Sequence, residues 1–315
     1  MSEGATINAE QFPSRLARRL AGGHFVVTAE INPPRHADPD TVRRQARNLV
    51  GVVDAVNLTD CTRGILRMSS LAAALLVREV GIEPIVQMTC RDRNQIALQS
   101  ELLGMSALGL ANVLLLSGDD PAHGDHPNAK GVFDLNGTTL LAAANRLRRE
   151  GKSTADRTIA HLPHLFLGAA GDPGRDLAQP DKPTIRDKAE AGADFIQTQP
   201  VFDFDRFGAW MQLVQDAGLA DRMSILAGVF VLDSAKRAEF LKGIPGMSMP
   251  DAVVQRLTTA SDPEAEGLQI AVETANHLAA MPGVRGVHLM GIEATSAMRS
   301  IIEASTLAAR VQEPD

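Results

Sequence analysis

Aromatic residues are scarce in this chain of 315 residues, which has no tyrosine, one tryptophan and ten phenylalanines. A surface that binds single-stranded nucleic acid stacks bases on aromatic side chains, so this composition argues against such a surface. An excess of basic charge is also missing, because the formal net charge is −7 and the arginines are scattered. We therefore expect no nucleic-acid partner.

Cysteine is nearly absent, since only Cys61 and Cys90 occur. Two cysteines are too few for a disulfide framework, and their spacing is not that of metal ligands. We expect no metal site and a reducing, cytoplasmic location. The N-terminus has no apolar stretch typical of a secretion signal, and no apolar run is long enough to cross a bilayer, so we expect no membrane association.

Two common nucleotide-binding signatures are missing as well. No Gly-x-Gly-x-x-Gly follows the first predicted strand, and no Gly-x-x-x-x-Gly-Lys-Ser/Thr occurs. These absences disfavour a Rossmann cofactor domain and a P-loop NTPase. The pair His161 and His164 precedes a predicted strand, so solvation or packing explains these histidines better than metal binding.

Apolar stretches of strand length alternate with segments of helical pattern from residue 24 onward. The eight predicted strands are 24–30, 54–59, 83–89, 112–116, 165–170, 195–199, 224–229 and 286–290. Eight β-then-α units without an evident linker predict an α/β fold, a single (β/α)8 TIM-type barrel domain over residues 1–315. We expect 1–23 to form an extra amphipathic helix and 311–315 to form a tail.

Two long polar loops, 117–137 and 171–184, follow the fourth and fifth predicted strands. Long loops at the carboxyl edge of a barrel are usually functional. A further stretch rich in proline and glycine, 243–251, follows the seventh strand, where we expect it to interrupt a helix.

The end of the fourth strand is the most informative junction, because the apolar run 112–116 stops at Ser117-Gly118-Asp119-Asp120-Pro121. Glycine lets a ligand approach the backbone closely, and a carboxylate at the carboxyl end of a parallel strand is placed for chemistry. We interpret Asp119 as a functional group and Asp120 as a turn residue. The alternative for Asp119 is a side-chain turn cap.

Glu30 differs from the other polar strand ends because it lies within an otherwise apolar strand. Burial would raise its pKa and suit it to general-acid catalysis. The alternative is a structural ion pair with Arg35 or Arg63. Thr59 and Gln199, which end two other strands, could bind a ligand or merely satisfy backbone groups.

Three segments carry a resemblance to a known family. They are Ala-Glu-Ile-Asn-Pro-Pro-Arg at 29–35, Leu-Ser-Gly-Asp at 116–119, and Ala-Gly-Ala-Asp at 191–194 followed by Thr-Gln-Pro-Val-Phe-Asp at 198–203. In order and spacing they resemble the methylenetetrahydrofolate reductase family, whose members are flavin-dependent (β/α)8 enzymes of one-carbon metabolism. The resemblance covers about residues 24–305.

The resemblance implies reduction of 5,10-methylenetetrahydrofolate to 5-methyltetrahydrofolate, with NADH or NADPH as hydride donor and FAD as cofactor. It implies that Glu30 is the general acid, that Asp119 lies beside both flavin and folate, and that Gln199 contacts the folate. Asp119 is also among the flavin-binding positions that it implies, and the others are Thr59, Gln87, Ser117, Gly118, Ala169, Asp181 and Lys188.

Several positions depart from the family pattern. Ser117 stands for a usual arginine, Gln87 for a histidine and Gly171 for a tyrosine, while Ala235 replaces an aromatic residue and Ala294 a substrate-binding arginine. FMN, or no tightly bound flavin, therefore remains open. One alternative function is a flavin-free, NADH-dependent folate reductase. Another is a folate-binding or methyl-transferring subunit that needs a partner protein, and a homo-oligomer is a further alternative.

Overall fold

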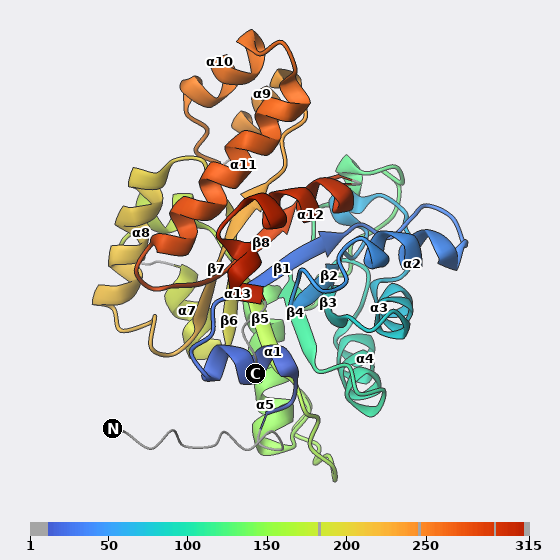
Figure 1. The fold of residues 1–315 in the computed structure, drawn as a ribbon. Helices are drawn as coiled ribbons and strands as arrows, with labels where there is room; N and C mark the ends of the chain where they lie inside the picture. Colours follow the sequence, from blue (N-terminus) through green and yellow to red (C-terminus); the bar gives the residue numbers. More distant parts are fainter. Residues whose placement is uncertain (1–11, 182–183, 245–246, 293, 312–315) are drawn as a thin grey trace.

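Eight parallel strands form a closed barrel in the computed structural model, which describes residues 12–181, 184–244, 247–292 and 294–311 (Figure 1). Each strand pairs with the next along the chain, and the last pairs with the first. The strands are β1 (Val26–Ile31), β2 (Ala55–Leu58), β3 (Glu83–Thr89), β4 (Asn112–Leu116), β5 (Phe166–Gly171), β6 (Phe195–Pro200), β7 (Ser224–Phe230) and β8 (Val284–Met290). The predicted (β/α)8 barrel is confirmed.

Helices follow the strands around the outside of the barrel (Figure 1). They are α1 (Arg15–Ala21), α2 (Pro39–Arg47), α3 (Ser70–Glu79), α4 (Gln95–Ala107), α5 (Gly137–Glu150), α6 (Pro173–Ala178), α7 (Thr184–Ala191), α8 (Phe204–Asp216), α9 (Ala235–Lys242), α10 (Asp251–Thr259), α11 (Pro263–Ala280), α12 (Thr295–Ala304) and α13 (Leu307–Val311). Two 3₁₀ turns, η2 (Thr62–Gly64) and η3 (Pro121–His123), lie in the loops after β2 and β4.

Helix α1 closes the amino end of the barrel. Its Leu16 and Leu20 are buried with the first inward-facing residues of the strands, which are Val26, Ala55, Ile85, Leu114, Phe195 and Leu226. The carboxylate of Glu83 accepts hydrogen bonds from the backbone N–H groups of Arg15 and Leu16, at 2.9 and 3.0 Å. A negative charge at a helix N-terminus is stabilising, so Glu83 fixes the helix against β3. Of the predicted helix 1–23, residues 1–11 lie outside the described part.

A polar layer fills the barrel above this apolar plug. Because side chains alternate along a strand, Thr28 of β1 faces inward two residues after Val26. Its hydroxyl oxygen lies 3.0 Å from Nδ1 of His288 and accepts a hydrogen bond from Nε2 of Gln197 at 3.3 Å. Gln197 exchanges two hydrogen bonds with Asn57, at 2.6 and 3.0 Å. These four buried residues satisfy one another, so the barrel interior remains polar beneath its rim.

The connection between β7 and β8 is the largest departure from a simple barrel. Helices α9 and α10 stand away from the strands at the top of Figure 1, over a small separate core that includes Phe202, Leu241 and Ile270. Helix α9 ends at Lys242 and α10 begins at Asp251, so the stretch 243–251 separates two helices as predicted. Residues 245–246 of this stretch lie outside the described part.

We predict that His288→Asn changes how stability depends on pH. Burial lowers the pKa of His288 from 6.5 to about 3, so the folded protein holds it neutral while the unfolded chain takes up a proton. Wild-type stability should therefore fall by up to about 1.4 kcal/mol per pH unit as the pH drops below 6.5, relative to the variant.

Urea unfolding of both proteins between pH 7.5 and pH 4.5 measures this difference. At pH 7.5 we expect the variant to be the less stable protein. The difference in free energy of unfolding between the two proteins should become smaller towards acid pH. A difference that stays constant with pH would contradict a buried neutral histidine.

Candidate active site

Glu30 lies on the inward face of β1, two residues beyond Thr28 and above the polar layer. Nδ2 of Asn32 donates a hydrogen bond to Oε1 of Glu30 at 3.0 Å, and the Gln87 side chain also hydrogen-bonds the carboxyl. Burial raises the pKa of Glu30 from 4.5 to about 7, although these hydrogen bonds and the charge of Arg67 act to lower it. A carboxyl with this pKa can hold a proton near neutral pH and release it, as a general acid must.

The alternative reading of Glu30 as an ion-pair partner is wrong for both arginines that we considered. Arg35 is paired with Asp125 at 2.6 Å, and Arg63 makes no ion pair within the described part of the chain. Arg67 is the arginine whose charge reaches Glu30, but its guanidinium donates to the backbone oxygen of Pro33 at 3.0 Å. None of these three arginines forms an ion pair with Glu30, so its carboxyl can still take up and release a proton.

Thr59 supports Glu30 through a third residue. The Thr59 hydroxyl donates to Oδ1 of Asn32 at 3.0 Å, which turns the Asn32 amide towards Glu30. The Thr59 hydroxyl is thus engaged in this relay, and the expected contact of Thr59 with a cofactor stays a prediction. Asn32 was absent from our predicted site residues, although its spacing of two residues from Glu30 could have identified it.

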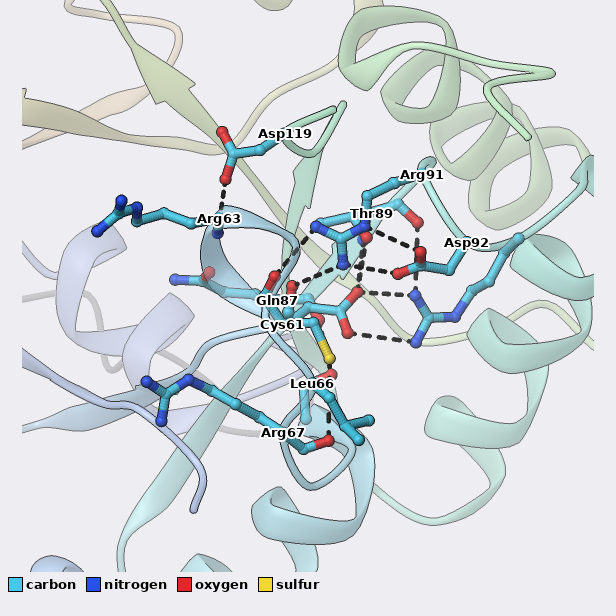
Figure 2. Close-up of polar contacts among 12 residues, drawn as sticks. Cys61, Arg63, Leu66, Arg67, Gln87, Thr89, Arg91, Asp92 and Asp119 are labelled. Carbon is cyan, nitrogen blue, oxygen red and sulfur yellow. Dashed lines mark hydrogen bonds and ion pairs between the residues drawn. The ribbon is translucent and has the colours of Figure 1, made fainter. Parts of the chain in front are cut away.

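Asp119 lies at the carboxyl end of β4, where its Oδ2 accepts a hydrogen bond from the backbone N–H of Arg63 at 2.7 Å. Its side chain is exposed and joins the loops after β4 and β2 (Figure 2). The neighbouring Asp120 accepts from the N–H of Ala122 at 2.9 Å and begins η3, so its assignment as a turn residue is confirmed. Asp119 does not cap its own turn, which leaves it available to a ligand.

Gly118 is required by packing at the same junction. Its φ is +88°, a conformation that glycine adopts readily. A Cβ atom at this position would lie 2.9 Å from Cβ of Thr89 and 3.0 Å from Cβ of Arg91. The backbone before Asp119 therefore packs directly on β3.

A buried charge cluster joins the loops after β2 and β3 (Figure 2). Asp60 accepts hydrogen bonds from the N–H and hydroxyl of Thr89, both at 2.9 Å, and forms an ion pair with Arg93 at 2.7 Å. The buried Arg91 pairs with Asp92 and donates to the backbone oxygen of Cys61 at 3.0 Å. The sequence alone did not reveal that Asp60 and Arg91 share one cluster.

A cavity of about 530 Å³ opens between the ends of β4 and β5. Ser117, Arg175, Thr184 and Lys188 line it, together with the first residues of α5. Nζ of Lys188 donates to the backbone oxygen of Ala170, and burial lowers the pKa of its ammonium group. The Ser117 hydroxyl accepts from the N–H of Gly137 at 2.9 Å, at the start of α5.

The donors around this cavity fit the phosphate end of a flavin or nicotinamide nucleotide. The Lys188 ammonium, the Arg175 guanidinium and the N-terminus of α5 line the cavity, which is chemistry that binds phosphate, and the Asp187 carboxylate lines it as well. Ala169 can contribute only its backbone, because its side chain is buried among the residues that pack β5 against the helices. Asp181 is exposed and is not among the residues that line the cavity.

The remaining predicted residues, Gln87 and Gln199, lie in different places. Gln87 is buried and contacts Glu30, so it belongs to the general-acid group. Gln199 is exposed and lines a small hollow with Phe202 and Ser248, because the register of β6 against β7 shifts between Gln197 and Pro200. Among the described residues, no contact joins Gln199 to Glu30.

Metal-ligand clusters and membrane-spanning helices are both absent from the described part of the chain. No group of three histidine, cysteine or acidic side chains there could hold a metal ion. No helix in the same ranges has both the length and the apolar character needed to cross a membrane.

Known proteins similar to this chain include folate enzymes. Methylenetetrahydrofolate reductase 2 of Schizosaccharomyces pombe is 24% identical over 269 residues, which are 82% of this chain and 41% of that protein. Methylenetetrahydrofolate reductase (NADH) 1 of Arabidopsis thaliana is 24% identical over 226 residues, which are 69% of this chain and 37% of that protein. The chain thus spans about two fifths of the length of these curated relatives.

A solved structure shares the fold. A protein from Clostridium thermocellum, described as binding two copies of 5-methyl-5,6,7,8-tetrahydrofolic acid, superposes with a TM-score of 0.63 at 16% identity. The match covers 95% of this chain and 98% of the other. The family model for methylenetetrahydrofolate reductase matches residues 15–306, from the helix that closes the barrel to the end of α12 and beyond. The chain therefore belongs to the methylenetetrahydrofolate reductase family.

Proposed function

We propose that this protein reduces 5,10-methylenetetrahydrofolate to 5-methyltetrahydrofolate with hydride that comes from NADH or NADPH. The observation that carries the proposal is Glu30, whose carboxyl has a pKa of about 7 at the carboxyl end of a barrel of this family. Relatives in the family are named for this reaction, one of them with NADH and another with NADPH. Either nicotinamide nucleotide is therefore compatible with the proposal.

Glu30 would supply the proton that opens the five-membered ring of the folate. Protonation of a ring nitrogen by the Glu30 carboxyl lets the bond from that nitrogen to the bridging carbon break, which leaves a cationic iminium on the substrate. The Asn32 amide would then stabilise the Glu30 carboxylate by the hydrogen bond that it already donates at 3.0 Å. Hydride addition to the iminium carbon yields the methyl group.

Asp119 would stabilise the positive charge that develops on the substrate. Its carboxylate is held at the rim by the Arg63 amide and is exposed to a ligand. A fixed negative charge near an iminium is favourable, and the effect is strongest where water is excluded. The backbone hydrogen bond keeps the carboxylate oriented before the substrate arrives.

A bound flavin would accept hydride from the nicotinamide and pass it to the folate. Lys188 and Arg175, with Thr184 and the start of α5, would hold its phosphate in the cavity between β4 and β5. The backbone at Gly118 and Asp119 lies between this cavity and the loop after β2, where the ring system would meet the folate.

Direct hydride transfer from NADH to the folate is a second candidate function. Ser117 favours it, because its short side chain is engaged with the Gly137 amide at 2.9 Å and adds no positive charge for a flavin. Glu30 and Asp119 keep their roles in both candidates.

An absorbance spectrum of the purified protein, with and without added FAD or FMN, separates the two candidates. The proposed function predicts a yellow protein whose flavin is bleached by anaerobic NADH or NADPH and recovers its colour with methylenetetrahydrofolate. Activity that persists in fully flavin-free protein would favour direct transfer. Isolated protein that neither oxidises NADH nor NADPH with the folate would refute both and favour a subunit that needs a partner.

Glu30→Gln should abolish the folate half-reaction and spare the nicotinamide half-reaction. Loss of a general acid typically lowers the rate by a factor of about 10² to 10⁴. The wild-type rate of folate reduction should be highest below the Glu30 pKa of about 7 and decline above it, because the acid form is lost. Stopped-flow rates from pH 6 to pH 9 test this, and an unchanged rate in the variant would overturn the role of Glu30.

Asp119→Asn should lower folate turnover by roughly a factor of ten or more, because the variant loses the charge that stabilises the iminium. It should also raise the potential of any bound flavin, since a nearby negative charge disfavours an anionic reduced flavin. Asp120→Asn is the matched control, because Asp120 caps η3 and does not contact Arg63. Equal effects of the two substitutions would contradict the assignment.

A further inference from the structure

Arg63 adopts a backbone conformation that side chains rarely take. Its φ is +60°, in the left-handed region, and Cys61 two residues earlier has a φ of +47°. Non-glycine residues in this region are uncommon, and the strain persists where surrounding contacts enforce it, often at functional sites. Two such residues in one short turn suggest that the turn serves to place a side chain.

Contacts from neighbouring strands hold this turn from both ends. Asp119 accepts from the N–H of Arg63 at 2.7 Å, and Arg91 donates to the backbone oxygen of Cys61 at 3.0 Å. Figure 2 shows Arg91 and Asp92 on one side of the loop and the Arg63 side chain extending the other way. The turn therefore directs the Arg63 guanidinium away from the buried charge cluster.

The Arg63 guanidinium lies over the ring of Phe240, with 5.2 Å from its carbon to the ring centroid. Phe240 belongs to α9 and is 50% exposed, which is unusual in a chain with so few aromatic residues. Arg63 follows β2 and Phe240 follows β7, and the strands between them in the barrel are β1 and β8. The pair thus joins two rim loops on either side of the strand that carries Glu30.

Several other arginines at the carboxyl rim have carboxylate partners, while Arg67, in the same loop as Arg63, donates to the backbone oxygen of Pro33. Arg35 pairs with Asp125 at 2.6 Å, Arg93 with Asp60 at 2.7 Å and Arg237 with Asp233 at 2.9 Å. Arg63 has neither an ion pair nor a side-chain hydrogen bond with any described residue. An exposed guanidinium that rests on an aromatic ring is oriented at little entropic cost and keeps its donors available for a carboxylate.

We propose that Arg63 and Phe240 form a subsite for the aminobenzoyl-glutamate part of the folate. This inference rests on the proposed function. Phe240 would pack against the aminobenzoyl ring, and Arg63 would pair with a glutamate carboxylate. The pterin of a folate must reach Glu30, and beyond the pterin a folate carries first an aromatic ring and then carboxylates. These two groups match Phe240 and Arg63 in chemistry. We assign Arg63 to a carboxylate and not to a nucleotide phosphate, because the cavity between β4 and β5 already offers donors for phosphates.

The test compares two probes by calorimetric titration of the full chain. One is 5-methyltetrahydrofolate, and the other is a tetrahydropterin that lacks the aminobenzoyl-glutamate part. Arg63→Gln should weaken binding of the folate by about tenfold, which corresponds to about 1.4 kcal/mol, and leave the pterin unchanged. Arg63→Gly should do the same and suits a φ of +60°, so it separates loss of the side chain from loss of the turn.

Phe240→Leu should reduce the preference for the folate over the pterin by a smaller factor, about threefold, because it keeps apolar bulk but removes the aromatic face. Arg237→Gln on the same helix is the control and should leave the preference unchanged, since Arg237 is paired with Asp233. Folate binding to wild type with an unaltered preference in both Arg63 variants would overturn the subsite. Wild-type protein that binds no folate would instead refute the proposed function.

Discussion

Every inward-facing side chain of this barrel shares one closed space with the inward residues of the other strands, and this constraint shapes the site. The lowest layer is apolar and packs on α1, while the next layer is a set of polar groups that satisfy one another around Gln197. Glu30 lies one layer higher, half-buried on the inward face of β1. The same closure that gives the barrel its core therefore raises the pKa of Glu30 to about 7.

The rim combines charges of both signs in a defined arrangement. Glu30 is on the inward face of β1 and Asp119 is exposed at the end of β4, while Lys188 lines the cavity between β4 and β5 and Arg63 lies over Phe240. The buried cluster around Asp60 fixes the loops after β2 and β3, so these charges are oriented before any ligand binds. Such preorganisation is the usual source of electrostatic stabilisation in enzymes.

The strands could be predicted almost to the residue, because a parallel strand buried on both faces is a short apolar run that ends abruptly. The turn role of Asp120 could also be predicted, since Gly-Asp-Asp-Pro is a turn sequence, and the ligand role of Asp119 stays a prediction. Contacts between loops could not be predicted. The pairing of Asp60 with Arg93 and the approach of Arg63 to Phe240 depend on how distant segments meet. The outward side chain of Ala169 was missed because a strand of small residues shows no alternation of polarity.

The seal that α1 makes at the amino end has a consequence for traffic through the protein. With Leu16 and Leu20 packed on the lowest layer and the helix fixed to Glu83, α1 covers the amino end of the barrel in the described part of the chain. In the proposed function the hydride donor and the folate would both enter at the carboxyl rim. The flavin-dependent route would exchange the two ligands there between half-reactions, whereas direct transfer would require the rim to admit both at once.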